Sequence, residues 1–307
     1  MYKQLGVSIY ETRLNWSQIA TRRPRHAASP NDPAYHWPVA IRQALQQANQ
    51  FHMRVLLQVI GTPSWANGGR PWNWAPNNPA DYAAFTAAAA REYPGVRLWM
   101  IWGEPSRSPN FRPLTRAKPG ARLNAAQQRA PHNYARLVDS AYAALKRLST
   151  RNIVIAGCTY TTGDIDTQQW IQNLRLPNGR PPRMDMYAHN PFSWEDPNFS
   201  DPPSPHGEVM FSDLPRLARW IDRYLRPGLP IFLSEWTVTT NVDRQFNFYV
   251  DPGIAAKWIR DALRLSRGWS RIYGLGWVNV YDSPPASYGG LLTSDGTPKP
   301  SFYAFAS

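Results

Sequence analysis

The sequence predicts an α/β fold of the (β/α)8-barrel type, formed as a single domain by residues 1–307. Short apolar runs alternate with helical patterns along the whole chain, which is typical of a parallel sheet with helices outside it. No linker or break in composition divides the chain, and one such barrel takes about 250 residues. A doubly wound sheet would also alternate, but the glycine-rich phosphate loops that usually accompany it are missing from this sequence.

Seven apolar segments are predicted to be strands. The second of them is followed by Gly61-Thr62-Pro63, a combination that stops extended structure. The predicted strands are Leu5–Tyr10, Val55–Ile60, Leu98–Trp102, Ile153–Cys158, Met184–His189, Pro230–Glu235 and Ile272–Val280. This number is one strand fewer than a complete eight-stranded barrel needs.

Helical patterns fill the intervals between the predicted strands. One of them begins with Asn78 and Pro79, which are favoured at the N-cap and at the first helical position, and Pro94-Gly95 ends it. The predicted helices are Pro38–His52, Pro79–Tyr93, His132–Leu148, Gln168–Leu174, Leu214–Leu225 and Ile254–Ser266.

The charge of the chain is strongly basic, with 34 Lys and Arg against 21 Asp and Glu and a formal net charge of +13. A nucleic-acid partner is one interpretation of such a charge. However, the basic residues are spread along the chain, and no basic helix, zinc finger or RNA-binding motif is present. We therefore expect a solvated, arginine-rich surface and no nucleic-acid partner. If the chain bound nucleic acid instead, its affinity would fall steeply with salt concentration. Replacement of Glu104, a candidate catalytic residue described below, by Gln would leave that binding unchanged.

Several classes of protein are excluded by the residues that the chain lacks. No run of about 18 apolar residues is present, so no membrane span is expected. Cys158 is the single cysteine and lies in a predicted strand, so we expect a core residue and no internal disulfide. The six histidines show no zinc-binding spacing, so neither a metal nor another cofactor is expected. The first residues lack the pattern of a signal peptide, and localisation stays open because a truncated N-terminus could have lost one.

Two predicted strands end in a glutamate, and in a (β/α)8 barrel the chemistry lies at the carboxyl ends of the strands. Glu104 and Glu235 each stand in an apolar, aromatic context, where desolvation raises the pKa of a carboxyl group. Glycoside hydrolysis needs two carboxyl groups, one protonated and one ionised, and such surroundings separate their pKa values. The alternative is that both are surface glutamates at strand–loop junctions.

The segments around both glutamates resemble a known clan of enzymes. Ile101-Trp102-Gly103-Glu104-Pro105 resembles the W-N-E-P acid/base motif of retaining (β/α)8-barrel glycoside hydrolases, and Phe232–Trp236 resembles their strand-7 nucleophile segment. The closest pattern is that of the family 39 and family 5 type, in particular β-glycosidases. Four further segments extend the resemblance along the chain, namely Leu14–Ile19, Gly61–Ala66, Gly290–Leu292 and Gly296–Pro300.

The resemblance implies roles for named residues. Glu104 would be the acid/base and Glu235 the nucleophile, about 5–5.5 Å apart, with retention of anomeric configuration. His189 matches a family histidine that contacts the sugar or positions a carboxylate, and Trp277 matches a family tryptophan that forms the floor of the sugar subsite. A core residue is the alternative for each. Tyr187 shares the inward face with His189, where it could either form a hydrogen bond with Glu235 or fill the barrel. Two further expected substrate-binding residues are Trp65 and Asn190.

Three departures from the family pattern stand out. The family asparagine before the acid/base, which hydrogen-bonds the sugar 2-hydroxyl, is Gly103 here. Asn190 is one candidate to replace it. A family arginine on an early strand aligns with Glu11, and Arg13 is the candidate substitute because it has the same strand parity. Leu5-Gly6-Val7 resembles the family's second strand, so the first strand of the barrel is expected to be missing at the N-terminus.

Two loops are predicted to face the substrate. The 30 prolines and 13% aromatic residues suit long ordered loops that line a sugar site. Asn67–Pro79 carries Trp72 and Trp74, which could stack on sugar faces or fold on one another. Ser106–Pro131 carries six basic residues and no acidic one, which indicates either a solvated loop or a clamp for an acidic glycan.

These observations predict a monomeric retaining glycoside hydrolase that cleaves β-linked glycosides or polysaccharides, including acidic ones. The alternative is a carbohydrate-binding barrel of the same family, with catalysis weakened by Gly103 or by the missing strand. The sugar, the linkage and endo or exo action are not predicted.

Overall fold

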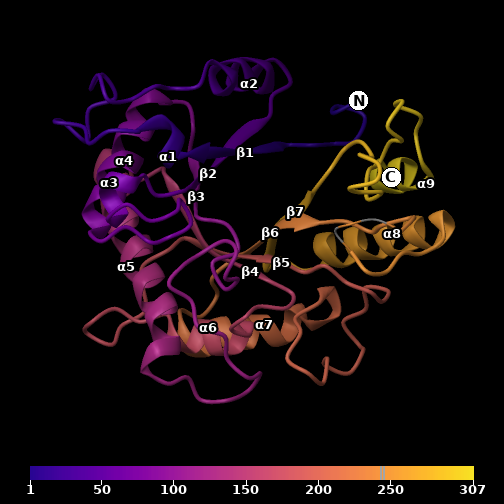
Figure 1. Cartoon of the computed structure of the whole chain (residues 1–307). Coiled ribbons are helices and arrows are strands. Elements are labelled where there is room, and N and C mark those ends of the chain that lie inside the picture. Colours follow the sequence, from indigo (N-terminus) through magenta and orange to yellow (C-terminus); the bar gives the residue numbers. More distant parts are fainter. Residues whose placement is uncertain (243, 245) are drawn as a thin grey trace. The chain divides into compact units, whose positions relative to one another are not determined.

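The computed structural model describes residues 1–242, 244 and 246–307. Its seven strands follow one another in sequence order, and the pairs β1–β2, β2–β3, β3–β4 and β6–β7 are parallel (Figure 1). This confirms the predicted fold class, an α/β fold of the incomplete (β/α)8-barrel type. The strands are β1 (Ile9–Asn15), β2 (Arg54–Ile60), β3 (Leu98–Ile101), β4 (Ile153–Tyr160), β5 (Met186–Asn190), β6 (Ile231–Trp236) and β7 (Ile272–Trp277).

Helices separate the strands along the chain, as the sequence predicts. Each of the six predicted helices is present, with ends that differ by a few residues in most cases. The helices are α1 (Trp16–Ile19), α2 (Val39–Gln50), α3 (Ser64–Asn67), α4 (Pro79–Glu92), α5 (Ala125–Leu148), α6 (Thr167–Asn173), α7 (Leu214–Tyr224), α8 (Pro252–Gly268) and α9 (Pro300–Phe305), with a 3-10 turn at Phe211–Asp213.

The chain divides into two compact units, which we call the N-terminal and C-terminal units. The N-terminal unit contains residues 7–159 and 163–187, and the C-terminal unit contains residues 1–6, 160–162 and 188–307. Each is described separately below. That the whole chain forms a single domain stays a prediction.

The bounds of two predicted elements differ most from those in the structure. The first strand was expected at Leu5–Tyr10, but it runs over Ile9–Asn15, in parallel register with Arg54–Ile60. Residues 2–6 form turns instead. Because β1 contains polar residues, it is not a continuous apolar run, and the strand was therefore predicted in the wrong place. Helix α5 begins at Ala125 rather than at His132, because Asn124 and Gln127 form a capping box that starts the helix upstream of its internal proline.

Aromatic residues and tyrosine hydroxyl groups join helices to strand ends in the N-terminal unit. Tyr82 of α4 donates to the Val59 carbonyl at 2.7 Å, and Tyr134 of α5 donates to the Ile101 carbonyl at 2.6 Å. The Tyr134 hydroxyl group also accepts from the Gly157 amide at 2.9 Å. Each hydroxyl group thereby satisfies backbone groups at the end of a parallel strand. Helices α4 and α5 pack side by side, as Figure 1 shows, through small residues that include Ala83 and Ala144.

Gly157 in β4 can only be glycine. Its φ is +96°, and an added Cβ would lie 2.5 Å from the Tyr187 ring. The close approach lets the Tyr187 side chain pack flat on the strand and be fully buried.

A buried ion pair joins two segments of the C-terminal unit. The Lys299 ammonium group lies 2.9 and 3.0 Å from the two Asp282 carboxylate oxygens and donates to the Tyr288 carbonyl at 2.9 Å. The two charged side chains are only 9% and 7% exposed. The pair therefore fastens the segment before α9 to the segment that follows β7.

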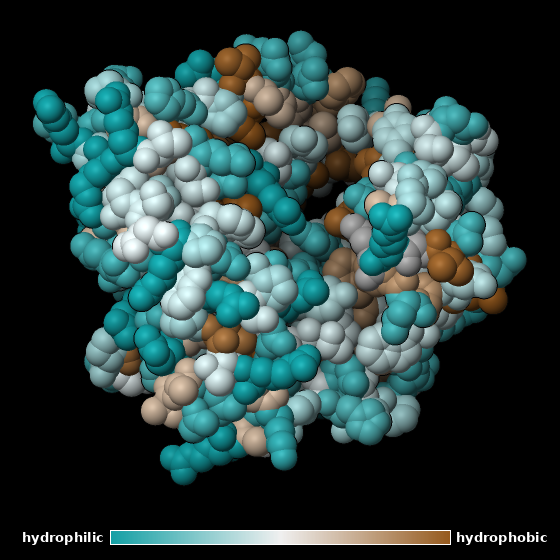
Figure 2. Space-filling model, in the orientation of Figure 1, coloured by the Kyte–Doolittle hydropathy of each residue, from teal (hydrophilic) through white to brown (hydrophobic). Residues whose placement is uncertain are grey.

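Hydrophilic residues cover most of the face in Figure 2, with hydrophobic residues in small separate groups. Among the residues that the structure describes, no helix is long and apolar enough to cross a membrane.

Candidate active site

Glu104 follows β3 in a strained backbone segment. Trp102 and Glu104 have φ angles of +67° and +45°, in the left-handed region that residues other than glycine rarely adopt. Each such residue costs about 1–3 kcal/mol, and residues of this kind cluster at functional sites. The conformation turns the chain sharply at the carboxyl end of β3, the place where the sequence predicts the chemistry.

The Glu104 carboxylate is held by the turn that follows it. Arg107 donates to Glu104 Oε2 at 2.7 Å, and Asn110 Nδ2 donates to the same oxygen at 2.9 Å. The Asn110 carbonyl in turn accepts from the Trp102 indole N–H at 2.8 Å. With 13% of the side chain exposed, Glu104 is mostly shielded and is fixed by charge-assisted hydrogen bonds.

Gln58 of β2 occupies the space beside Gly103. A Cβ added at Gly103 would lie 3.0 Å from the Gln58 Oε1 and 3.1 Å from its Nε2, so a larger residue there requires the carboxamide to move. Gln58 accepts from Arg13 Nε at 3.2 Å and donates to Glu11 Oε1 at 3.3 Å. The structure thus joins Arg13 and Glu11 through one buried carboxamide, and this carboxamide lies against the residue that precedes Glu104.

The loop that carries Trp72 and Trp74 is hydrogen-bonded to the segment after Glu104. The backbone of Arg112 accepts from Ala75 and donates to Asn73, both at 2.8 Å. Trp72 is 45% exposed, and its stacking on a sugar stays a prediction. The Arg70 guanidinium group lies 4.5 Å from the centre of the Trp74 ring and covers one of its faces.

Trp65 is anchored rather than exposed. Its indole N–H donates to the Ala20 carbonyl at 2.7 Å, and its ring packs edge-on against Trp16 with 5.5 Å between centres. The Arg23 guanidinium group lies 4.7 Å from the same ring. These contacts indicate that Trp65 supports the loop after β2.

In the C-terminal unit, Glu235 lies in the last part of β6 beside Asn190. The Asn190 Oδ1 accepts from the Ser234 hydroxyl at 2.6 Å and from the Glu235 amide at 3.2 Å. Asn190 is fully buried and Ser234 is 5% exposed. Asn190 therefore fixes the backbone at Glu235, a role that the sequence did not indicate.

The other expected substrate-binding residues are deeply placed. His189 is fully buried, and its Nε2 lies 2.8 Å from the Val209 carbonyl. Tyr187, in the N-terminal unit, shares a 3.1 Å hydrogen bond with Thr159, and burial raises the pKa of its phenol. These placements suit the core alternative for both residues, and their contact with a sugar stays a prediction.

Trp277 is only half-buried. Its indole N–H donates to the carbonyls of Asn279 and Gly289, both at 3.1 Å, and its ring meets Trp236 edge-on at 5.6 Å. The ring is thereby fixed in orientation while part of it stays accessible, and its contact with a sugar stays a prediction.

Sequence reasoning missed Asn110 and Gln58. Gln58 had a usable signal, because it is the single polar residue in the run Val55–Ile60. Asn110 had none, because its contact with Glu104 depends on the turn between them. Among the described residues, no group of three or more His, Cys, Asp or Glu side chains is placed to hold a metal ion.

The fold is similar to that of solved glycoside hydrolases. A family 39 glycoside hydrolase from the gut symbiont Bacteroides cellulosilyticus WH2 matches with a TM-score of 0.64 and 17% identity, over 99% of this chain and 58% of that one. A monomeric β-xylosidase from Caulobacter crescentus CB15 matches with a TM-score of 0.65 and 16% identity, over 99% and 62%. A calcium-binding mutant of Bacteroides uniformis β-glucuronidase 2 matches with a TM-score of 0.60 and 12% identity, over 99% and 30%.

These matches confirm the family 39 resemblance at the level of the fold. The chain spans about three fifths of the length of the first two of these proteins. No protein-family model matches the chain, and no curated protein matches it in sequence.

Proposed function

We propose that the chain is a retaining glycoside hydrolase that cleaves β-linked oligo- or polysaccharides. The observation that carries the proposal is the position of two glutamates at the carboxyl ends of parallel strands. Glu104 follows β3 in a strained turn, and Glu235 lies at the end of β6. In barrels of this type, catalytic residues occupy these strand ends.

The proposed reaction has two steps. Glu235 attacks the anomeric carbon while Glu104 gives a proton to the departing glycosidic oxygen, which leaves a glycosyl ester on Glu235. Glu104 then takes a proton from water, and that water displaces Glu235 from the anomeric carbon. Two inversions give net retention, and neither step needs a metal or an organic cofactor.

The surrounding residues support this assignment of roles. Arg107 and Asn110 hold the Glu104 carboxylate, and Asn190 holds the backbone at Glu235. Trp72 offers an exposed ring on a loop that is tied to the segment after Glu104. Aromatic rings of this kind suit the apolar faces of sugars.

Hydrolysis of a panel of aryl β-glycosides by the whole chain tests the proposal. We expect turnover of at least one glycoside, and proton NMR should record the β-anomer as the first sugar product, because retention precedes mutarotation. If the α-anomer forms first, the two-step mechanism is wrong. If the folded chain turns over neither these glycosides nor a panel of β-linked polysaccharides, glycosidase activity is wrong.

A carbohydrate-binding protein with weakened catalysis is the second candidate. Gly103 favours it, because this residue brings no side-chain donor next to Glu104, and the space beside it is filled by Gln58. Saturable binding of an oligosaccharide without any hydrolysis would support this candidate over the first.

A further inference from the structure

We propose that the substrate of this site is an anionic glycan that carries uronate carboxylates, recognised by the basic loop. The basic loop is residues 105–124, between β3 and α5, and it holds five basic residues and no acidic one. The inference rests on the proposed function, because it names the substrate class of the same site.

The basic loop has a fixed backbone. Asp164, in the loop after β4, binds both of its arms. The Asp164 amide donates to the Ser106 carbonyl at 2.9 Å, and its carboxylate accepts from the Ser108 amide at 2.7 Å. Its carbonyl accepts from the Ala117 amide at 2.8 Å. Side chains at the start of α5 and α6 hold the next part of the loop, because Gln127 donates to the Arg116 carbonyl at 2.9 Å and Gln169 donates to the Lys118 carbonyl at 3.0 Å.

Two arginines flank Asp164. Arg116 forms an ion pair with it, with 3.1 Å between Nε and Oδ1, and the Arg116 side chain is 82% exposed. Burial raises the pKa of Asp164, but hydrogen bonds from Ser108 and the charges of Arg116 and Arg107 outweigh it, so the net pKa is lowered. Asp164 is therefore ionised at neutral pH, and the carboxylates of Asp164 and Glu104 together pair with two of the five basic residues of the loop.

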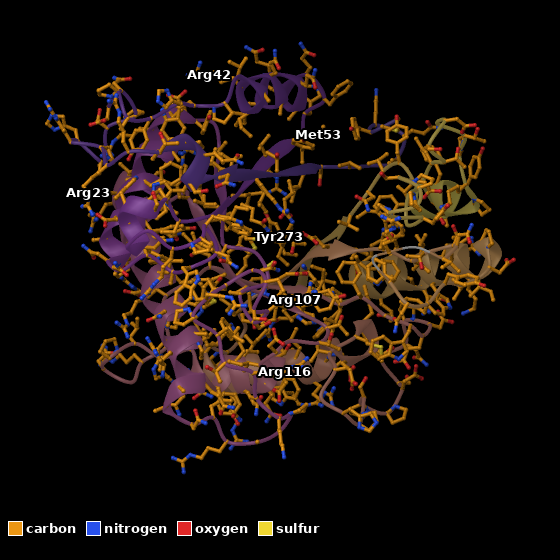
Figure 3. The ribbon with its side chains drawn as sticks, in the orientation of Figure 1. Arg23, Arg42, Met53, Arg107, Arg116 and Tyr273 are labelled. Atoms are coloured by element: carbon orange, nitrogen blue, oxygen red, sulfur yellow. The ribbon has the colours of Figure 1, made fainter. Side chains whose placement is uncertain are left out.

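The basic loop begins next to Glu104, the candidate acid/base. Arg107 Nη1 lies 2.7 Å from Glu104 Oε2, and the charges of Arg107 and Arg116 both act on Asp164; Figure 3 labels the two arginines. A guanidinium group has five N–H donors and can bind a carboxylate through two parallel hydrogen bonds. Because the loop backbone is already fixed, little conformational entropy is lost when an anionic group binds.

The neighbourhood of the basic loop favours a glycan over a nucleic acid. Its Arg112 backbone is hydrogen-bonded to the loop that carries Trp72 and Trp74, so the basic loop and a loop with two aromatic side chains are joined. Glu104 is integrated into the same surface by Arg107. A strained, hydrogen-bonded carboxylate has a role in cleavage of a glycosidic bond and none in binding of a phosphate backbone.

Binding of matched acidic and neutral glycans to the whole chain tests the proposal. The probes are oligosaccharides of hyaluronan and of β-linked mannuronate, each compared with its carboxyl-reduced form. Isothermal titration calorimetry in the cold measures the affinity for each probe. We expect at least one acidic form to bind about tenfold or more tightly than its reduced form at low salt, as one charge-assisted contact predicts. The difference should shrink when the salt concentration is raised to about 1 M.

Arg116→Gln should lower this preference about tenfold, while the matched variant Arg42→Gln should keep it. Arg42 also forms an ion pair, with Glu92 at 2.6 Å, and lies well away from Arg116 within the N-terminal unit (Figure 3). Equal affinity for acidic and reduced glycans, or equal effects of both variants, would overturn the proposal. The proposal would also be overturned if single-stranded DNA bound as tightly as the acidic glycan and if this binding depended on Arg116. Because these are binding measurements, they stay separate from aryl glycoside turnover, which tests the proposed function alone.

Discussion

Glu235→Gln should abolish the hydrolysis of aryl β-glycosides, with a loss on the order of 10⁴-fold or more, because the glycosyl ester cannot form on an amide. The substitution keeps the size of the side chain, and the backbone amide of residue 235 can still donate to Asn190. The measurement is initial rates for the wild type and the variant on the glycoside with the highest turnover. Unchanged activity in Glu235→Gln would show that the nucleophile is another residue.

Glu104→Gln should behave differently. Loss of a general acid typically costs about 10²–10⁴-fold, and the loss should be greatest for glycosides with poor leaving groups, which need protonation. A dinitrophenyl glycoside should retain much of its first-step rate. Glu92→Gln is a suitable control, because Glu92 is paired with Arg42 at the end of α4. Equal losses for good and poor leaving groups would contradict the role of Glu104 as the acid.

Lys299→Met should lower the free energy of unfolding by about 3–5 kcal/mol, because it leaves the Asp282 carboxylate buried without its counter-charge. Asp282 would still accept from the Gly290 amide at 2.7 Å, but one amide does not replace an ammonium group that contacts both oxygens. Urea unfolding of the wild type and the variant measures the difference.

Lys257→Met is the matched control for this prediction. Lys257 is 59% exposed and pairs with Asp196 and with Asp261, and exposed ion pairs contribute little to stability, so its loss should cost much less than the loss of Lys299. The double variant Asp282→Asn with Lys299→Met should be less destabilised than the sum of the single variants. If Lys299→Met costs no more than Lys257→Met, the buried pair contributes little to stability.

Strands could be predicted from the sequence where burial makes them continuous apolar runs. The prediction Val55–Ile60 differs from β2 by one residue, since most of this strand is buried. Strand β1 is largely accessible, with Glu11 and Arg13 on one of its faces, so its polarity concealed it and the prediction began too early. The helices α1, α3 and α9 have four to six residues, too few to produce a helical period.

The candidate site was predictable only in part. The two glutamates could be located because fold class alone says which ends of the strands carry chemistry. The hydrogen bond from Asn110 to Glu104 depends on positive φ angles at Trp102 and Glu104, which no pattern of residue types encodes. The contact between Gln58 and Gly103 depends on the register of adjacent strands and on a side-chain rotamer. Contacts of this kind depend on how the chain folds in three dimensions.

Tyr82 and Tyr134, which fasten α4 and α5 to the strands, and Tyr187 of β5 should also make the stability of the fold depend on alkaline pH. Burial raises the pKa of Tyr82, Tyr134 and Tyr187 in the folded chain, whereas an unfolded chain ionises these phenols near pH 10. Above that pH the folded state binds more protons than the unfolded state, so stability is full below about pH 10 and declines as the pH rises. Ultraviolet absorbance should therefore register these three phenolates only together with the loss of circular dichroism. Their appearance in a chain that keeps its circular dichroism would contradict the buried placement. At alkaline pH, the absorbance of these buried phenols therefore reports the unfolding of the chain.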